Sequence, residues 1–164
     1  MHPHPPAPTR KFDPPSRPGQ QETRTVLLAE DDREMRQMLA KALRKAGYRV
    51  RECPDGLQLL DLLRAVLFLH QGGETIDLIV SDVRMPGASG QEILEQFHHC
   101  PRFPPMILIT AFGDEQAHVK AEWFGAAAMF DKPFDVDMLI EKVGELLARE
   151  GNAEDGRSGV RSKE

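Results

Sequence analysis

The sequence predicts an α/β fold in which a parallel β-sheet carries helices on both faces. Five short runs rich in apolar residues alternate strictly with five segments whose apolar residues recur at helical spacing, and the connections are short. Two of these runs, residues 76–80 and 106–109, are apolar almost throughout, as expected of strands covered on both faces. Strict alternation of this kind is typical of parallel strands joined by crossover helices.

Each predicted strand is a short run bounded by polar or turn-forming residues. Residues 48–53 alternate polar and apolar side chains, which is typical of an edge strand. The other four runs are more uniformly apolar, which indicates burial within the sheet. The five predicted strands comprise residues 26–29, 48–53, 76–80, 106–109 and 127–130.

Most of the predicted helices follow a carboxylate that can accept hydrogen bonds from the first helical turn. These capping residues are Asp31 or Asp32, Asp55, Asp114 and Asp135. Gly47 and Gly125 stand where a residue in the left-handed conformation often ends a helix. The helices are predicted within residues 35–46, 55–70, 93–97, 114–124 and 136–147, with the second ending at residues 71–73.

The two ends of the chain differ in composition from the middle. Residues 1–24 hold seven of the 13 prolines, and residues 150–164 consist mainly of glycine, serine and charged residues. Neither end can bury enough apolar surface to offset the conformational entropy lost on ordering. We therefore predict one domain over residues 25–149, flanked by a disordered Pro-rich tail at 1–24 and a disordered polar tail at 150–164.

Charge and composition argue against several classes of protein. The formal net charge is −5, and because the tails carry +2 and −1, the predicted domain carries −6. Nucleic-acid binding surfaces are normally basic, so we expect no nucleic-acid partner.

The composition also bears on location. The most continuous apolar stretch, residues 65–69, is too short to span a bilayer, and no signal-peptide pattern is visible. Cys53 and Cys100 lack metal-ligand spacing and are interpreted as free thiols of a reducing compartment. We therefore expect a soluble, cytoplasmic protein with no membrane partner.

Polar residues follow four of the predicted strands at their carboxyl ends. These ends converge in the crevice where open α/β sheets bind ligands. Carboxylates, a hydroxyl and an ammonium group gathered there indicate a divalent cation and a phosphoryl group. The residues are the acidic run Glu30, Asp31 and Asp32, followed by Asp82, Thr110 and Lys132.

Each of these residues also has a simpler structural explanation. Asp31 and Asp32 can cap the first helix, and Asp82 can be a turn residue. Thr110 can end a strand without any function, and Lys132 can be a solvated surface charge. The functional hypothesis depends on their joint occurrence at successive strand ends.

Four segments together resemble a bacterial response-regulator receiver domain of two-component signalling. The resemblance covers about residues 25–149 and implies a flavodoxin-like sheet with strand order 2-1-3-4-5 and five helices on both faces. No single segment is decisive, but their order, each at a strand end, is specific. The segments are residues 26–32 (VLLAEDD), 81–87 (SDVRMPG), 110–111 (TA) and 132–134 (KPF).

The resemblance assigns a role to each site residue. It implies that Asp82 is the phosphoacceptor for a sensor histidine kinase or a histidine phosphotransferase, in a reaction that requires Mg²⁺. Thr110 and Lys132 would bind phosphoryl oxygens. Glu30 stands where the family more often has aspartate, so its longer side chain is expected to act through water. The implied metal-binding groups are Glu30, Asp31, Asp82 and the backbone carbonyl of Arg84.

The sequence departs from the family pattern at two places. The family usually carries an aromatic residue three positions before the lysine, but here that position is Met129. Phe130 is its neighbour, and because side chains alternate along a strand we expect Phe130 to face the opposite core. Residues 64–75 form an unusually long segment that lengthens the second helix or the loop after it.

The leading hypothesis is a stand-alone receiver that is not itself an enzyme. The chain after residue 149 is too short for an effector domain, so we expect output through contacts with an unknown protein or through onward phosphotransfer. A phosphorylation-independent adaptor is an alternative. A Mg²⁺-dependent phosphatase with an aspartyl-phosphate intermediate is a further one, but such enzymes place a second aspartate two residues on, where this chain has Arg84.

Overall fold

The computed structural model describes residues 22–69 and 73–155 of the chain. Five strands and five helices alternate along these residues, as predicted. The elements are β1 (Thr25–Ala29), α1 (Arg33–Lys45), β2 (Arg49–Cys53), α2 (Gly56–Leu67), β3 (Leu78–Asp82), α3 (Gly90–Phe97), β4 (Met106–Ala111), α4 (Glu115–Trp123), β5 (Ala128–Lys132) and α5 (Val136–Asp155).

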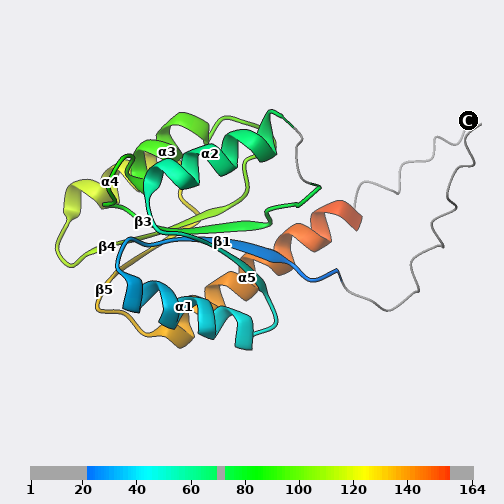
Figure 1. Ribbon diagram of the computed structural model, residues 1–164, viewed down its shortest axis with the longest axis horizontal. Helices are drawn as coiled ribbons and strands as arrows, with labels where there is room; N and C mark the ends of the chain where they lie inside the picture. The colour runs from blue at the N-terminus through cyan, green and yellow to red at the C-terminus, as the bar shows by residue number, and fades with distance from the viewer. Residues whose placement is uncertain (1–21, 70–72, 156–164) are drawn as a thin grey trace, which may run out of the picture.

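All neighbouring strands pair in parallel, and their order in the sheet is β2-β1-β3-β4-β5. Helices α2, α3 and α4 cover one face of the sheet, while α1 and α5 cover the other (Figure 1). This confirms the predicted strand order and the predicted two-sided covering. Strand β2 lies at an edge and buries only two of its five residues, as its alternating sequence predicts.

The core consists of two apolar layers, one on each face of the sheet. Alternation along a strand sends neighbouring side chains into different layers. In β1, Leu27 packs with α2, α3 and α4, whereas Leu28 packs with α1 and α5. In β5, Met129 contacts the first layer and Phe130 the second, which confirms the expectation that Phe130 cannot replace the aromatic residue missing at position 129.

Several element boundaries differ from the sequence predictions. Strand β3 runs over Leu78–Asp82 rather than 76–80, because its pairing with β4 continues until Asp82 lies opposite Ile109. The carboxylate of Asp77 accepts a hydrogen bond from the backbone N–H of Thr25 beside the start of the strand. Asp82, predicted to follow the strand, is therefore its last residue, and Lys132 likewise ends β5.

Helix α2 is shorter and α5 is longer than predicted. Helix α2 ends at Leu67 with Phe68 as its C-cap, so the long segment lengthens the loop after the helix and not the helix itself. Helix α5 continues to Asp155, into the segment predicted to be a disordered tail. Residues 1–21, 70–72 and 156–164 lie outside the described residues, so the disorder predicted for most of both tails stays a prediction. Among residues 22–69 and 73–155, none of the helices combines the length and the apolar character that a membrane span requires.

Candidate functional site

The candidate site lies at the carboxyl edge of the sheet, where β1, β3, β4 and β5 end. Glu30 directly follows β1, Asp82 ends β3, and Lys132 ends β5. Thr110 lies in β4 and is paired with Asp131 of β5. The parallel register therefore brings together residues from four distant segments of the chain, as expected from their positions at predicted strand ends.

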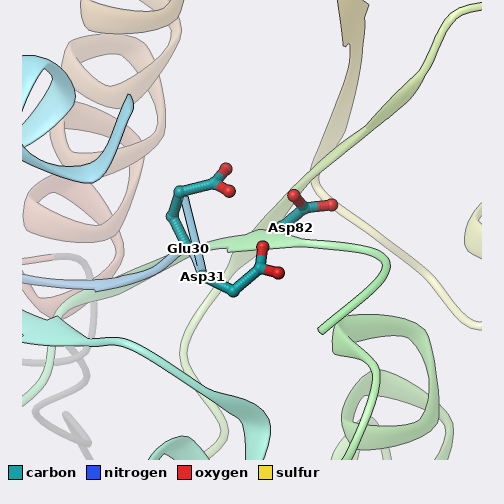
Figure 2. Close-up of side chains that lie close together, drawn as sticks. All are labelled: Glu30, Asp31 and Asp82. Atoms are coloured by element: carbon teal, nitrogen blue, oxygen red, sulfur yellow. The ribbon is translucent and has the colours of Figure 1, made fainter. Parts of the chain in front are cut away.

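Three carboxylates face a common space at this edge. One carboxylate oxygen from each of Glu30, Asp31 and Asp82 lies within 4.8 Å of the others. Figure 2 shows the three side chains projecting toward one another from the ends of β1 and β3. Glu30 and Asp82 are buried, whereas Asp31 is exposed to solvent.

The side chain of Asp32 has a different role. It is the N-cap of α1 and accepts a hydrogen bond of 2.7 Å from the backbone N–H of Met35. Of the two aspartates predicted as possible caps of the first helix, Asp32 is the cap, while Asp31 remains available at the site. A separate hydrogen bond, from the backbone N–H of Asp32 to Oε1 of Glu30, holds the side chain of Glu30.

Lys132 connects the two buried carboxylates. Its Nζ lies 2.7 Å from Oδ2 of Asp82 and 3.2 Å from Oε2 of Glu30. Burial by itself would lower the pKa of Lys132, but the hydrogen bond and charge of Asp82, followed by the charge of Glu30, raise it above its ordinary value. Lys132 is therefore a protonated ion-pair partner and not a freely solvated surface charge.

The negative charge of the site is only partly compensated. Of the three acidic side chains, Glu30 and Asp82 share the ammonium group of Lys132, and no ion pair of Asp31 occurs among the described residues. Burial and the negative charge of Asp82 raise the pKa of Glu30 to about 7, although the N–H of Asp32 and the charge of Lys132 act against this shift. This excess of carboxylate oxygens is the ligand chemistry that hard divalent cations prefer, so the residues present fit Mg²⁺.

Thr110 brings an unsatisfied hydroxyl to the same edge. Its side chain is completely buried, and Oγ1 has no hydrogen-bond partner among the described residues. A buried hydroxyl without a partner is costly, so buried polar groups are nearly always hydrogen-bonded. The orphaned hydroxyl is thus free to bond an oxygen atom brought into the site.

Two local features hold Asp82 in place. The backbone N–H of Arg84 donates to Oδ1 of Asp82 over 3.1 Å. A Cβ atom at Gly90, the first residue of α3, would overlap the backbone carbonyl oxygen of Asp82 and lie 2.6 Å from Oγ of Ser81. Glycine at this position lets α3 begin directly against the end of β3.

Some contacts around the site carry no local sequence signal. The guanidinium of Arg84 forms a 3.0 Å ion pair with Asp114, the N-cap of α4, which lies 30 residues further along the chain. Arg36 of α1 donates to the backbone carbonyl oxygen of Glu30 over 2.8 Å. Both are basic residues on polar surfaces, and only the tertiary arrangement reveals their partners.

The fold and the acidic edge together define a class of signalling module, the receiver that takes up phosphoryl groups. The chain matches the family model of the response regulator receiver domain over residues 26–144, and it belongs to this family. Members are the phosphoacceptor modules of two-component signalling, which interact with histidine kinases or phosphotransfer proteins.

The curated relatives differ in how much of their own length this chain covers. The chain is 29% identical to sporulation initiation phosphotransferase F of Bacillus subtilis, with 77% of this chain and 96% of that protein aligned. It is 38% identical to the C4-dicarboxylate transport transcriptional regulatory protein DctD of Pseudomonas aeruginosa over 74% of this chain, but it spans only 25% of that protein. It likewise spans about a quarter of NtrC from Escherichia coli.

Solved structures agree with the fold. A putative response regulator from Chloroflexus aurantiacus superposes with a TM-score of 0.67 at 29% identity, covering 77% of this chain and 99% of that one. The receiver domain of a putative LuxO repressor protein from Vibrio parahaemolyticus gives a TM-score of 0.70 at 22% identity. The superposition covers 84% of this chain and 99% of that one. The second likeness is evidence for the fold alone.

Proposed function

We propose that Asp82 is the phosphoacceptor of this receiver. The observation that carries the proposal is the position of its buried carboxylate, which lies 2.7 Å from Lys132 Nζ and shares a space with two further carboxylates. A carboxylate oxygen of Asp82 attacks the phosphorus of a phosphohistidine, the P–N bond breaks, and its electron pair returns to the imidazole. The product is an acyl phosphate on Asp82.

Three residues prepare this step. Nζ of Lys132 and the hydroxyl of Thr110 are placed to bond phosphoryl oxygens, which stabilises the charge that develops during transfer. The N–H of Arg84 holds one oxygen of Asp82, which orients the carboxylate. Mg²⁺ held by Asp31, Asp82, the backbone carbonyl of Arg84 and, directly or through water, Glu30 would supply positive charge that offsets repulsion between the carboxylate and the phosphoryl group.

The output of the domain is proposed to be contact with another protein or onward phosphotransfer. The alignment with nearly the whole of sporulation initiation phosphotransferase F supports the second route. The phosphoryl donor is proposed to be a sensor histidine kinase or a histidine phosphotransferase. Both cysteines are free thiols, which fits a reaction in the reducing cytoplasm.

Catalytic turnover of an external substrate is not part of this proposal. A phosphatase with an aspartyl-phosphate intermediate needs an acid–base group near the nucleophile, typically two residues on. That position is Arg84, whose guanidinium is engaged by Asp114. We therefore assign the domain a switching role.

Intact mass spectrometry after incubation with acetyl phosphate and Mg²⁺ tests the acceptor. We expect one phosphate adduct on the unmodified chain, none in Asp82→Asn, and none when EDTA replaces Mg²⁺. Asp61→Asn is the matched control, because Asp61 is an exposed aspartate of α2 and should leave the adduct unchanged.

Two results would contradict the proposal. Retention of the adduct in Asp82→Asn would place the acceptor elsewhere. Absence of any adduct, with acetyl phosphate and with a phosphorylated kinase domain alike, would favour an adaptor that acts without phosphorylation.

A further inference from the structure

Helix α4 is connected to strand β5 by a side-chain hydrogen bond outside the site described above. Nε2 of His118 lies 2.7 Å from Oδ1 of Asp131, and because a carboxylate only accepts, the ring nitrogen donates. The side chains are 42% and 37% exposed. Asp131 is paired with Thr110 across the β4–β5 ladder and directly precedes Lys132. The hydrogen bond therefore adjoins two groups of the candidate site, Thr110 on the neighbouring strand and Lys132 on the same strand.

Helix α4 has little apolar contact with the rest of the domain. The residues that it buries are two alanines, Ala117 and Ala121, while Val119 and Trp123 are 68% and 83% exposed. Two buried methyl groups are a small apolar contact for a helix of nine residues. The position of α4 thus depends on polar contacts, which include Arg84 with Asp114 at its N-cap and His118 with Asp131 in its middle.

We propose that the bond between His118 and Asp131 is the contact through which phosphorylation of Asp82 repositions α4. The inference rests on the proposed function and names a regulatory element of the same site. Met129 occupies the position where the family usually has an aromatic residue, and its side chain packs on the same face of β5 as α4. In this chain a hydrogen bond from Asp131, two residues further along β5, makes the connection to α4 instead.

The physical basis is a change in the bonds made by the neighbours of Asp131. Lys132 is bonded to Asp82 and Glu30, and the hydroxyl of Thr110 has no partner among the described residues. A phosphoryl group on Asp82 offers new acceptors to both residues, so the ends of β4 and β5 have different contacts in the two states. A modification shifts a conformational equilibrium only through such differential contacts. Asp131 moves with these strand ends, and His118 transmits the movement to α4.

Trp123 provides a built-in reporter for this movement. It is the single tryptophan of the chain, it ends α4, and it lines a hollow together with Phe103 and Pro104 of the segment between α3 and β4. Movement of α4 relative to that segment changes the surroundings of the indole ring. Its fluorescence therefore reports the position of α4.

The experiment compares Trp123 fluorescence before and after addition of acetyl phosphate and Mg²⁺, with the Asp82 adduct quantified in the same samples by intact mass. We expect a fluorescence change in the unmodified chain that falls at least twofold in His118→Leu and in Asp131→Ala, with the adduct retained. His118→Gln keeps a donor near the position of Nε2 and should restore the change. The double variant, which combines His118→Leu with Asp131→Ala, should lose no more of the fluorescence change than either single variant, because both substitutions remove the same contact.

Glu145→Gln is the matched control. It removes an exposed 2.9 Å ion pair with Lys142 on α5 and should leave the fluorescence response intact. A response that is absent from the unmodified chain, or unchanged in His118→Leu, despite full formation of the adduct overturns the inference and leaves the proposed function standing. Absence of the adduct from the unmodified chain instead removes the proposed function, and the inference falls with it.

Discussion

At the scale of single residues, the site combines partly compensated negative charge with a hydroxyl, that of Thr110, which has no partner in the described part of the chain. Glu30 and Asp82 are buried next to each other and share the ammonium group of Lys132. Burial and the charge of Asp82 raise the pKa of Glu30 to about 7, so a second negative charge at this position is unfavourable. Such a site gains from a cation and from a phosphoryl group, which together provide counter-charge and hydrogen-bond acceptors.

The buried hydroxyl of Thr110 leads to a stability prediction. Thr110→Val keeps the shape of the side chain and removes a hydroxyl that has no partner among the described residues, so we expect the free energy of unfolding to rise by about 1 kcal/mol. Urea denaturation in the absence of Mg²⁺ and of a phosphate donor measures this free energy of unfolding. Thr110→Ser is the control, since it keeps the hydroxyl and loses a methyl group, and should destabilise by about 1 kcal/mol. Destabilisation by valine would mean that the hydroxyl is bonded in solution.

At the scale of elements, close contact between α3 and the end of β3 positions the loop that carries Arg84. The capping box of α3, formed by Ser89 and Glu92, defines where the helix begins. The backbone N–H of Gly90 donates to the carbonyl oxygen of Val83, which closes the loop. The start of α3 is thus tied to the strand that ends in Asp82.

Substitution of Gly90 tests the importance of this contact. Gly90→Ala places a methyl group against the carbonyl oxygen of Asp82 and Oγ of Ser81, so we expect a loss of about 2 kcal/mol or more in the free energy of unfolding. Gly144→Ala is the matched control in α5. There the new Cβ would meet only the hydroxyl of Tyr48, at 3.6 Å, and better helix propensity should stabilise the chain by about 0.5–1 kcal/mol. Thermal and urea unfolding of both variants measure these changes in the free energy of unfolding. Equal changes in Gly90→Ala and Gly144→Ala would contradict the close contact between α3 and the end of β3.

At the scale of the whole molecule, two apolar layers enclose the sheet and isolate some reactive groups from solvent. Cys53 ends the edge strand β2, yet it is only 4% exposed because it packs with the layer under α2. Burial raises the pKa of its thiol to about 11. Cys100 lies outside the helices and strands and is partly exposed.

Alkylation kinetics measure how well this layer excludes solvent. A raised pKa means less thiolate at about pH 8, and the thiolate is the nucleophile. Iodoacetamide should therefore modify Cys100 at least about tenfold faster than Cys53 in the folded chain, and both at similar rates in concentrated urea. Peptide mass mapping over time distinguishes the two sites. Equally fast labelling of Cys53 in the folded chain would show that the edge strand opens readily.

Sequence patterns predict the type and order of the elements better than their ends. The apolar run at 76–80 correctly indicates a buried strand, but pairing between β3 and β4 extends that strand to Asp82. The glycines at 72 and 73 suggest a later end for α2 than Leu67. Composition places the start of a tail at residue 150, whereas the helix continues to Asp155. The ends of strands and helices depend on pairing and capping partners, which lie elsewhere in the chain.

The amino-acid sequence alone determines the alternation of strands and helices, the two-sided burial of the central strands and the presence of Glu30, Asp31, Asp82, Thr110 and Lys132 near strand ends. These features follow from local periodicity, because each strand or helix must bury its own apolar face. Only the tertiary structure decides which side chains meet. The ion pair of Lys132 with Glu30 and the hydrogen bond of His118 with Asp131 depend on the register between strands and on helix placement, which no local pattern encodes. The same holds for the hydroxyl of Thr110, which has no partner within residues 22–69 and 73–155.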